Sequence, residues 1–281
     1  MRYVLYNPLS SHCPSEDTLK SEMEKIDSSK ELTLVDMTKI EDGDKFLKEL
    51  KKGDDLVISG GDGTLNHVVN SADFDSFDKP VYLYKAGNGN DFLRDINNLE
   101  ENFIEISKYL KNLPIVTING KTTKYINGVG FGVDGMVCVE SDKMKANGVK
   151  NINYTTLAIK LLLFKFKKVA AKVIVDGKEY RFKNVFIGSA MNGRYYGGGM
   201  KEAPDQDRLS DKVSVVVWHD FNRLTGLMNF PKIFTGEHVK NTKKITVLTG
   251  KEITMSFSLP TDLQIDGESL HGIFTYKVSK K

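Results

Sequence analysis

Cysteine is scarce in this sequence of 281 residues, which contains only Cys13 and Cys138, far apart from one another. Disulfide frameworks and zinc sites need several cysteines, or cysteines and histidines, at short and regular spacings. The sequence therefore offers neither a disulfide scaffold nor a zinc motif. Because proteins that fold without disulfides are typical of reducing compartments, we expect a cytoplasmic protein.

The sequence also lacks a long hydrophobic run and a strong excess of one charge. Its most apolar segment, Leu157 to Phe166, is shorter than the about 18 residues of a membrane span and is interrupted by Lys160 and Lys165. The first residues, Tyr3 to Tyr6, are typical of a strand and not of a signal peptide. The net charge of +3 comes without the basic, aromatic-rich cluster that nucleic-acid binding favours. We expect neither a transmembrane segment nor a nucleic-acid partner.

Several common catalytic motifs are absent as well. The serine-hydrolase motif Gly-x-Ser-x-Gly and the zinc-protease motif His-Glu-x-x-His do not occur. Gly120-Lys121-Thr122 ends like a Walker loop, but Ile115 stands where that loop requires its first glycine. Gly130 to Gly135 fits Gly-x-Gly-x-x-Gly formally, yet it lies too late in the chain for a dinucleotide-binding turn. These absences disfavour hydrolases, zinc proteases and dinucleotide oxidoreductases.

The sequence does contain two halves of different character. Up to about Pro114, strand-like and helical stretches alternate, which is typical of a parallel sheet covered by helices. Within this half, Ser15 to Ile26 has helical spacing with Ser15 as N-cap, and Phe103 to Leu110 has helical spacing too. Beyond Pro114 the runs are longer and β-branched, and Asp176-Gly177 between two of them predicts a hairpin.

We therefore predict an α/β fold with two domains. Residues 1–115 form an N-terminal parallel-sheet α/β domain, and residues 116–281 form a C-terminal, mainly antiparallel β domain whose tail could return to the first domain. In the second domain, Thr122 to Val129 is expected to be one strand. Helices are expected near Met136 to Met144, Tyr154 to Phe166 and Phe221 to Phe234.

The strongest local signal is the loop Gly60-Gly61-Asp62-Gly63-Thr64, which follows an apolar run and precedes a helical pattern. Glycine N–H groups and the start of a helix together form an anion site, for which phosphate is the usual ligand. Asp62 would repel a phosphate unless Mg²⁺ lay between them. A loop that is glycine-rich only because its turn is tight is the alternative, which the aspartate and the threonine disfavour.

Two other polar turns follow predicted strands. Asn7-Pro8 ends the first strand, and Gly87-Asn88-Gly89-Asn90-Asp91 follows the strand Val81 to Tyr84. Ligands of parallel sheets bind beyond the C-terminal ends of the strands, so Asn7, Gly87, Asn90 and Asp91 are predicted to bind nucleotide together with the glycine loop. Helix capping is the other common role of such an Asn-Asp pair.

These motifs resemble those of the superfamily of diacylglycerol kinases, sphingosine kinases and NAD kinases. The glycine loop resembles its signature, Gly87 to Arg94 resembles its Gly-x-x-Asn-Asp-Phe-x-Arg pattern, and Asn7-Pro8 resembles its first-strand motif. The sequence continues with Leu9-Ser10-Ser11, where the superfamily has a Ser-Gly pair.

The second half resembles the lipid kinase branch in particular. Gly130-Phe131 with Asp134 resembles a Gly-Phe-x-x-Asp motif, and Asp266-Gly267-Glu268 resembles the Asp-Gly-Glu motif. Gly197-Gly198-Gly199-Met200 followed by Ala203-Pro204-Asp205 resembles a segment that holds a structural magnesium in bacterial diacylglycerol kinases. Lys212 stands where that segment has glycine, and a solvated acidic loop is the alternative.

The resemblance implies ATP and Mg²⁺ as cofactors, a nucleotide cleft between the two domains, and a lipid site in the second. It implies that Asp62 and Asp134 organise the catalytic metal and that Glu268 is the general base. It also implies a metal site at Asp205, Asp207 and Asp211.

We accordingly predict a diacylglycerol kinase-like lipid kinase of phospholipid biosynthesis, which transfers the γ-phosphate of ATP to a lipid hydroxyl. An NAD kinase-like enzyme, or a non-catalytic nucleotide-binding protein with a decayed kinase site, is the alternative. The lipid partner implies a peripheral position at the membrane, and a homodimer is compatible with the sequence. Lys160 to Lys168 is either a core helix that ends in lysines or an interfacial helix.

Overall fold

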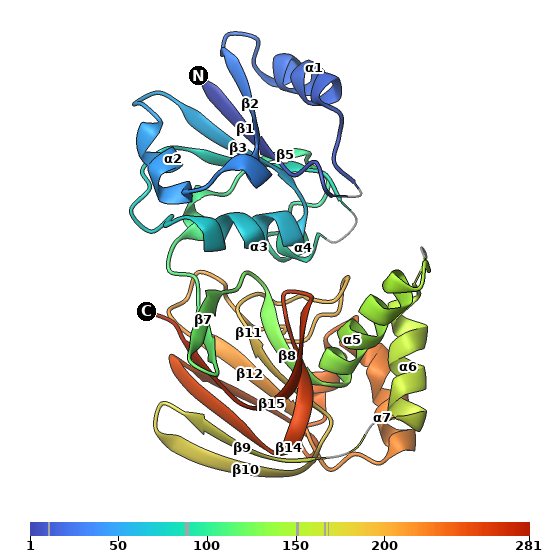
Figure 1. The fold of residues 1–281 in the computed structure, drawn as a ribbon. Coiled ribbons are helices and arrows are strands. Elements are labelled where there is room, and N and C mark those ends of the chain that lie inside the picture. The colour runs from blue at the N-terminus through green and yellow to red at the C-terminus, as the bar shows by residue number, and fades with distance from the viewer. Residues whose placement is uncertain (11, 88–89, 150–151, 166, 168) are drawn as a thin grey trace. The chain divides into compact units, whose positions relative to one another are not determined.

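The computed structural model describes residues 1–10, 12–87, 90–149, 152–165, 167 and 169–281. The chain forms two compact units, Met1–Asn112 and Leu113–Lys281 (Figure 1). The first unit has a parallel sheet with helices and the second has an antiparallel sheet, so the predicted α/β class with these two kinds of domain is confirmed.

The first unit is built on a five-stranded sheet of order β2-β1-β3-β4-β5. The first four strands in this order are parallel, and β5 pairs with β4 in the antiparallel direction. Because β1, β3 and β4 are parallel neighbours, their C-terminal ends meet at one edge of the sheet. The strands are β1 (Arg2–Tyr6), β2 (Leu32–Asp36), β3 (Asp55–Gly60), β4 (Val81–Lys85) and β5 (Phe103–Glu105).

Helices cover both faces of this sheet, with α1 on one side and α2 and α3 on the other (Figure 1). Helix α1 begins after Ser15, whose side chain accepts a hydrogen bond from the Thr18 N–H, as the sequence predicted. Leu19 and Met23, one turn apart, pack against Val4 of β1. The helices are α1 (Glu16–Ile26), α2 (Gly43–Glu49), α3 (Asp62–Ser71) and α4 (Asp91–Asp95), with 3₁₀ turns η1 (Met37–Lys39) and η2 (Ser107–Leu110).

The prediction of a helix from Phe103 to Leu110 is wrong. Phe103–Glu105 forms β5, and only Ser107–Leu110 turns as a 3₁₀ helix. The ring of Phe103 stacks on Tyr82 of β4 with 4.7 Å between the centroids. This pairing at the sheet edge outweighs the helical spacing of the apolar residues.

A buried ion pair fixes β1 against β3 at the end of the sheet opposite the glycine loop. The Arg2 guanidinium donates to both carboxylate oxygens of Asp55, at 3.0 and 2.9 Å, and Lys30 Nζ lies 2.6 Å from one of them. Burial opposes the charge of Asp55, but the hydrogen bonds from Arg2 and Lys30 outweigh it and hold the pKa of Asp55 below its usual value.

The second unit is built on a ten-stranded antiparallel sheet. Its main path is β13-β12-β11-β8-β14-β15-β6-β7, and β9 pairs with β10 and β14. The predicted hairpin is confirmed, since Asp176 and Gly177 join β9 to β10 with φ of +47° and +81°. The strands are β6 (Ile115–Ile118), β7 (Lys121–Lys124), β8 (Gly128–Gly132), β9 (Val169–Val175), β10 (Lys178–Val185), β11 (Ile187–Met191), β12 (Val213–Trp218), β13 (Ile245–Gly250), β14 (Glu252–Ile265) and β15 (Glu268–Ser279).

Three helices lie together along one side of this sheet (Figure 1). Leu162, Phe186, Trp218 and Phe221 are buried in the core that they share with the sheet. The helices are α5 (Val133–Ala146), α6 (Tyr154–Phe164) and α7 (Arg223–Asn229), with 3₁₀ turns η3 (Phe230–Ile233) and η4 (Glu237–Lys240). No helix within the described ranges is both long and apolar enough to cross a membrane.

Two predicted elements differ from those of the second unit. The single strand expected at Thr122 to Val129 is divided between β7 and β8, because the N–H groups of residues 126–128 bind a carboxylate described below. Helix α6 ends at Phe164, and Phe166, at the predicted end, lies outside the described residues.

Candidate active site

The glycine loop connects β3 to α3 at the C-terminal edge of the first sheet. Gly60 must be a glycine, because a Cβ there would lie 2.4 Å from the Cβ and Oγ1 atoms of Thr64. A Cβ at Gly63 would have no atom within 4 Å, so open space lies beside the first turn of α3. Gly61 is the N-cap of this ten-residue helix and supplies no side chain to its N–H groups. The helix start is therefore a suitable site for an anion.

Asp62 connects the glycine loop to the second polar turn. Its carboxylate accepts hydrogen bonds from the N–H groups of Asp91, at 2.8 Å, and Phe92, at 3.1 Å. The loops also meet through Ala86 N–H and the Gly60 carbonyl, at 3.2 Å. A Cβ at Gly87, which has φ of +146°, would lie 3.4 Å from the Gly61 backbone. Asp62 thus caps α4 and fixes one loop against the other, a role that its place in the motif did not reveal.

The other nucleotide-site candidates lie on the same edge of the sheet. Asn7 follows β1, the neighbour of β3, and its side-chain oxygen accepts the Leu9 N–H at 3.0 Å. Asn90 Nδ2 donates to the Gly87 carbonyl at 3.1 Å, and Asp91 is buried in the first turn of α4. The Asn88, Gly89 and Ser11 positions of these motifs lie outside the described residues.

Asp134 lies in the first turn of α5, directly after β8. It is 7% exposed, and within the described chain its Oδ2 atom has no hydrogen-bond partner. Burial raises the pKa of Asp134 to about 8; the nearby Tyr196 hydroxyl acts in the opposite direction, and the Glu202 charge adds a smaller increase. A Cβ at Gly130 would lie 2.3 Å from Asp134 Oδ2 and 2.7 Å from Gln264 Nε2, so this glycine makes room for both side chains.

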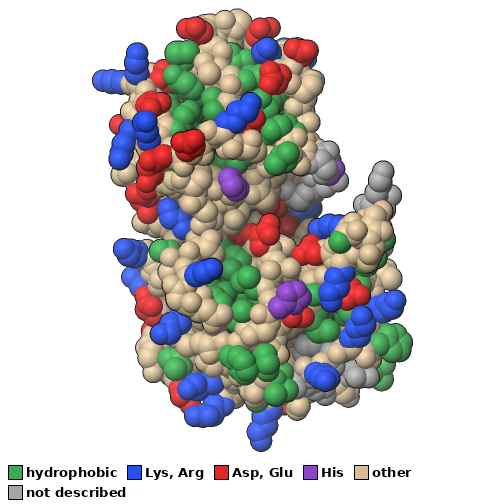
Figure 2. Space-filling view, in the orientation of Figure 1, with side chains coloured by type: hydrophobic (Ala, Val, Ile, Leu, Met, Phe, Trp, Pro, Cys, Tyr) green, Lys and Arg blue, Asp and Glu red, His purple; other side chains and the backbone are tan. Residues whose placement is uncertain are grey.

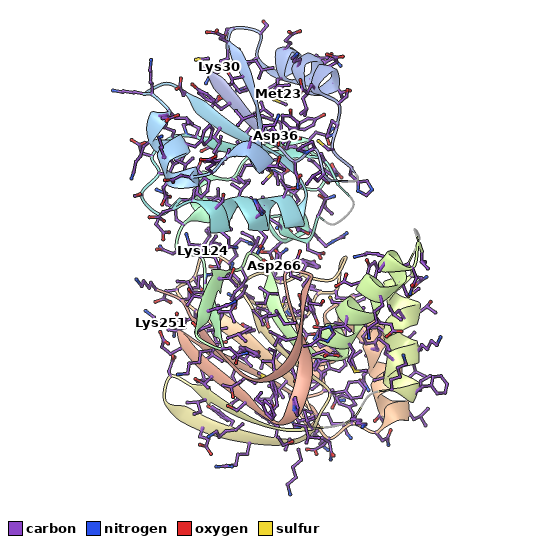
Figure 3. The ribbon with its side chains drawn as sticks, viewed as in Figure 1. Met23, Lys30, Asp36, Lys124, Lys251 and Asp266 are labelled. Atoms are coloured by element: carbon purple, nitrogen blue, oxygen red, sulfur yellow. The ribbon has the colours of Figure 1, made fainter. Side chains whose placement is uncertain are left out.

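Asp266 forms the tight turn between β14 and β15 (Figure 3) and lies beside the start of β8. Its φ of +46° and the +95° of Gly267 are typical of a two-residue hairpin turn. The Asp266 carboxylate accepts the N–H groups of Ile126, Asn127 and Gly128 at 2.5, 2.8 and 2.9 Å. Asp266 therefore holds the turn against β8, the strand that leads to Asp134.

Glu268 is the first residue of β15 and is exposed. Glu179, which is also exposed, lies one position further from its turn, since it is the third residue after Asp176 and Glu268 is the second after Asp266. Asp176 accepts the N–H groups of Lys251 and Glu252. The two turns differ in their surroundings. The pKa of Cys138 on α5 is raised to about 12, first by burial and then by the charges of Asp134 and Asp142. The charge of Glu268 adds a smaller increase. Glu268 thus lies near α5, the helix that carries Asp134. Glu179 is not among the residues that raise the Cys138 pKa.

The structure does not assemble the predicted metal site at Asp205, Asp207 and Asp211. All three side chains are exposed, whereas Gln206 and Arg208 between them are buried. Asp211 pairs with Lys251 Nζ at 2.5 Å, and Asp207 accepts the Leu209 N–H at 2.9 Å. In the part of the chain that is described, no three His, Cys, Asp or Glu side chains form a group that could hold a metal ion. These residues do not fit a bound magnesium.

Several buried polar residues near these motifs were missed from the sequence. Glu202 is fully buried and accepts hydrogen bonds from Trp218 Nε1 at 3.1 Å and Ser189 Oγ at 3.3 Å. Arg208 and Lys280 are buried as well. Lys280 lies beside other lysines, Lys277 and Lys281, which are exposed, so no signal in the sequence distinguished it. Buried charges of this kind appear only once the strands have been paired.

Comparison with known proteins identifies the family. Residues 127–276 match the YegS C-terminal NAD kinase beta sandwich-like domain, and residues 2–119 match the diacylglycerol kinase catalytic domain. Together the two matches span nearly all of the chain, in the order of the two units. This chain therefore belongs to the diacylglycerol kinase-like family of lipid kinases, a family of phosphotransferases.

Individual relatives agree with this placement. A Staphylococcus haemolyticus protein named "Putative lipid kinase" is 28% identical over 81% of this chain and 74% of its own length. A diacylglycerol kinase of Mycobacterium tuberculosis is 24% identical over 84% of this chain and 79% of its own. The crystal structure of a "putative diacylglycerol kinase" from Bacillus anthracis covers 99% of this chain and 93% of its own, with a TM-score of 0.71 and 18% identity. The last likeness shows a shared fold.

Proposed function

We propose that this protein is an ATP-dependent kinase that transfers the γ-phosphate to the hydroxyl of a diacylglycerol-like lipid. The joined loops at the edge of the first sheet support this proposal most. The start of α3 is uncapped by a side chain, has open space at Gly63, and is fixed to the next loop by Asp62. Such a rigid group of N–H donors suits the phosphates of a nucleotide.

In this proposal the first unit binds MgATP as the substrate. The N–H groups of Gly61 to Thr64 hold the phosphates, and Asn7, Asn90 and Asp91 border the same site. Asp134 Oδ2 is the buried, unpartnered oxygen that suits the cation of MgATP. A nearby cation favours the ionised carboxylate and so opposes the effect of burial on Asp134.

Glu268 is the proposed general base. The phosphoryl group moves from ATP to the lipid oxygen while the hydroxyl proton passes to the Glu268 carboxylate. Glu268 is exposed at a turn that Asp266 holds rigidly, which suits a group that must meet an incoming substrate. Holding both reactants in position supplies most of the rate in phosphoryl transfer, because the protein has little covalent chemistry to do.

The acceptor is proposed to come from the surface of an anionic membrane. Helices α6 and α7 adjoin and expose Phe164 by 74% and Leu224 and Met228 by 66% each. Figure 2 shows hydrophobic and basic side chains together over this side of the second unit. Leu161 and Leu162 of α6 are buried, so this helix has a core face as well as the exposed residues that an interfacial helix needs.

The acceptor class is tested by label transfer from γ-labelled ATP. Diacylglycerol, phosphatidylglycerol, a sphingoid base and NAD are offered separately at equal concentration. We expect labelled lipid, fastest with a glycerol-based acceptor. Faster formation of NADP than of any lipid phosphate would assign the chain to NAD kinase chemistry. Binding of ATP without transfer to any acceptor would make it a nucleotide-binding protein that has lost catalysis.

A further inference from the structure

Two buried cations lie close together, Arg208 in the loop between β11 and β12 and Lys280 directly after β15. Arg208 is 7% exposed and Lys280 is 4% exposed. Lys280 Nζ donates to Asn192 Oδ1 at 2.7 Å and to the Arg208 carbonyl at 2.8 Å. The Arg208 guanidinium donates to the Ile126 carbonyl and to Asn127 Oδ1, both at 2.9 Å. Both positive groups are thus surrounded by oxygen acceptors, the kind of environment that hard metal ions prefer.

Three backbone carbonyls of the loop, those of Asp207, Arg208 and Lys212, already accept hydrogen bonds from side-chain nitrogen atoms. Gln206 Nε2 donates to the carbonyls of Asp207, at 2.8 Å, and Lys212, at 3.0 Å. Lys280 binds the carbonyl of Arg208, which lies between them in the sequence. A magnesium ion needs about six oxygen ligands in octahedral geometry, and it would have to displace these donors to obtain them.

We propose that Lys280 and Arg208 replace a divalent cation in this loop, so that the loop and the strands beneath it are held without a metal ion of their own. The two side chains connect the end of β15, the loop and residues 126–127 into one buried network.

The same network reaches the proposed catalytic turn. Asn127 accepts from Arg208 through its side chain, and its N–H binds Asp266 at 2.8 Å. Asp266 in turn holds the hairpin that carries Glu268. Lys280 and Arg208 are therefore positioning residues for Glu268, a part of the proposal that rests on the proposed kinase function.

The electrostatic surroundings agree with a charged lysine at neutral pH. Burial and the neighbouring Arg208 lower the pKa of Lys280 to about 8, while Asp207 and Asp211 act in the opposite direction. Lys280 is thus mostly an ammonium ion at pH 7. Two buried cations repel each other, and each is stabilised by the oxygen atoms that it binds.

Thermal unfolding of the nucleotide-free full chain tests this proposal without any activity measurement. Wild type should unfold at the same temperature, within about 1 °C, in EDTA and in millimolar MgCl₂, because no metal is bound. Lys280→Met removes the hydrogen bonds that Lys280 donates to Asn192 Oδ1 and to the Arg208 carbonyl, and should lower Tm by at least about 3 °C. Lys277→Met, at an exposed lysine of β15 three residues earlier, should leave Tm unchanged.

Either of two results would overturn the proposal. One is a rise of more than about 3 °C in wild-type Tm on adding Mg²⁺ alone. The other is a Lys280→Met protein as stable as Lys277→Met. If Lys280→Met does not fold, calorimetric titration of wild type with MgCl₂ decides instead. We expect no binding there, and a Kd below about 1 mM would contradict a metal-free loop.

The positioning role has its own measurement. In Lys280→Met, amide exchange at residues 126–128 should be faster than in Lys277→Met, because the network that orders them has lost a member. In the labelled-ATP assay, kcat should fall about tenfold while the KM for ATP stays the same. Unchanged amide exchange would exclude the positioning role, whether or not the protein proves to be a lipid kinase.

Discussion

At the scale of single residues, Asp134 combines burial with an unpartnered oxygen atom. Its pKa of about 8 in the folded protein lies above its usual value of 3.8, so the folded state retains the proton longer than the unfolded state does. The free energy of unfolding should therefore decrease as pH rises from about 4 to about 8 and level off above that. Such a group lowers stability at neutral pH, which is common where a residue serves function.

Asp134→Asn removes the buried ionisable group, and its stabilising effect should depend on pH. We expect a Tm close to that of wild type at pH 4 and higher by at least about 3 °C at pH 8.5. Differential scanning fluorimetry at several pH values measures this. Asp142→Asn, an exposed acid of the same helix, should not show the trend. A lower Tm for Asp134→Asn at pH 8.5 would contradict a destabilising effect of the buried Asp134 carboxylate.

At the scale of elements, the glycine loop should bind ATP through open space at the start of α3. The Cβ atom of Gly63→Val would meet no atom of other parts of the chain within 4 Å, so the fold should accept the change while the phosphates lose their room. Calorimetry should show ATP affinity reduced by at least about a hundredfold. His67→Val, an exposed position one turn further along α3, is the control and should bind normally. Equal affinities in the two variants would exclude this loop as the phosphate site.

Elements with strong local signals could be predicted from the sequence. Helix α1 has its Ser15 cap and apolar spacing, and the β9–β10 hairpin has its Asp-Gly turn, so local chemistry determines both. Phe103–Glu105 has no such signal, because its state depends on pairing with β4. The divided strand at residues 122–129 depends on Asp266, which lies about 140 residues away in sequence.

The candidate site, too, could be predicted from the sequence only where its residues form a local motif. The glycine loop and the Asp-Gly-Glu turn could be found from their residues, since each is a local motif. The second role of Asp62, as cap of α4, needs two loops about 30 residues apart. The burial of Lys280 depends on where β15 ends. The exposure of Asp205 and Asp207 follows because Gln206 and Arg208, which alternate with them, are the residues that are buried. Such features follow from tertiary pairing, which composition and spacing do not encode.

At the scale of the whole molecule, the exposed residues of α6 and α7 should support binding to anionic membranes. Phe164→Ser should weaken co-sedimentation with vesicles of phosphatidylglycerol and phosphatidylcholine by at least about fivefold, because an inserted aromatic side chain is lost. Phe274→Ser, at a residue that is 56% exposed on β15, is the control and should bind like wild type. Equal loss in both variants, or no loss in either, would place the membrane contact elsewhere.

The most direct measurement is the initial rate of label transfer from γ-labelled ATP to a lipid extract by wild type, Glu268→Gln and Glu179→Gln. The two variants make the same change at exposed glutamates beside two similar Asp-Gly turns. Wild type and Glu179→Gln should phosphorylate lipid equally, and Glu268→Gln should be slower by at least about a hundredfold with ATP affinity unchanged. A loss of less than about tenfold in Glu268→Gln, or no labelled lipid with wild type, would contradict a lipid kinase that uses Glu268 as its base.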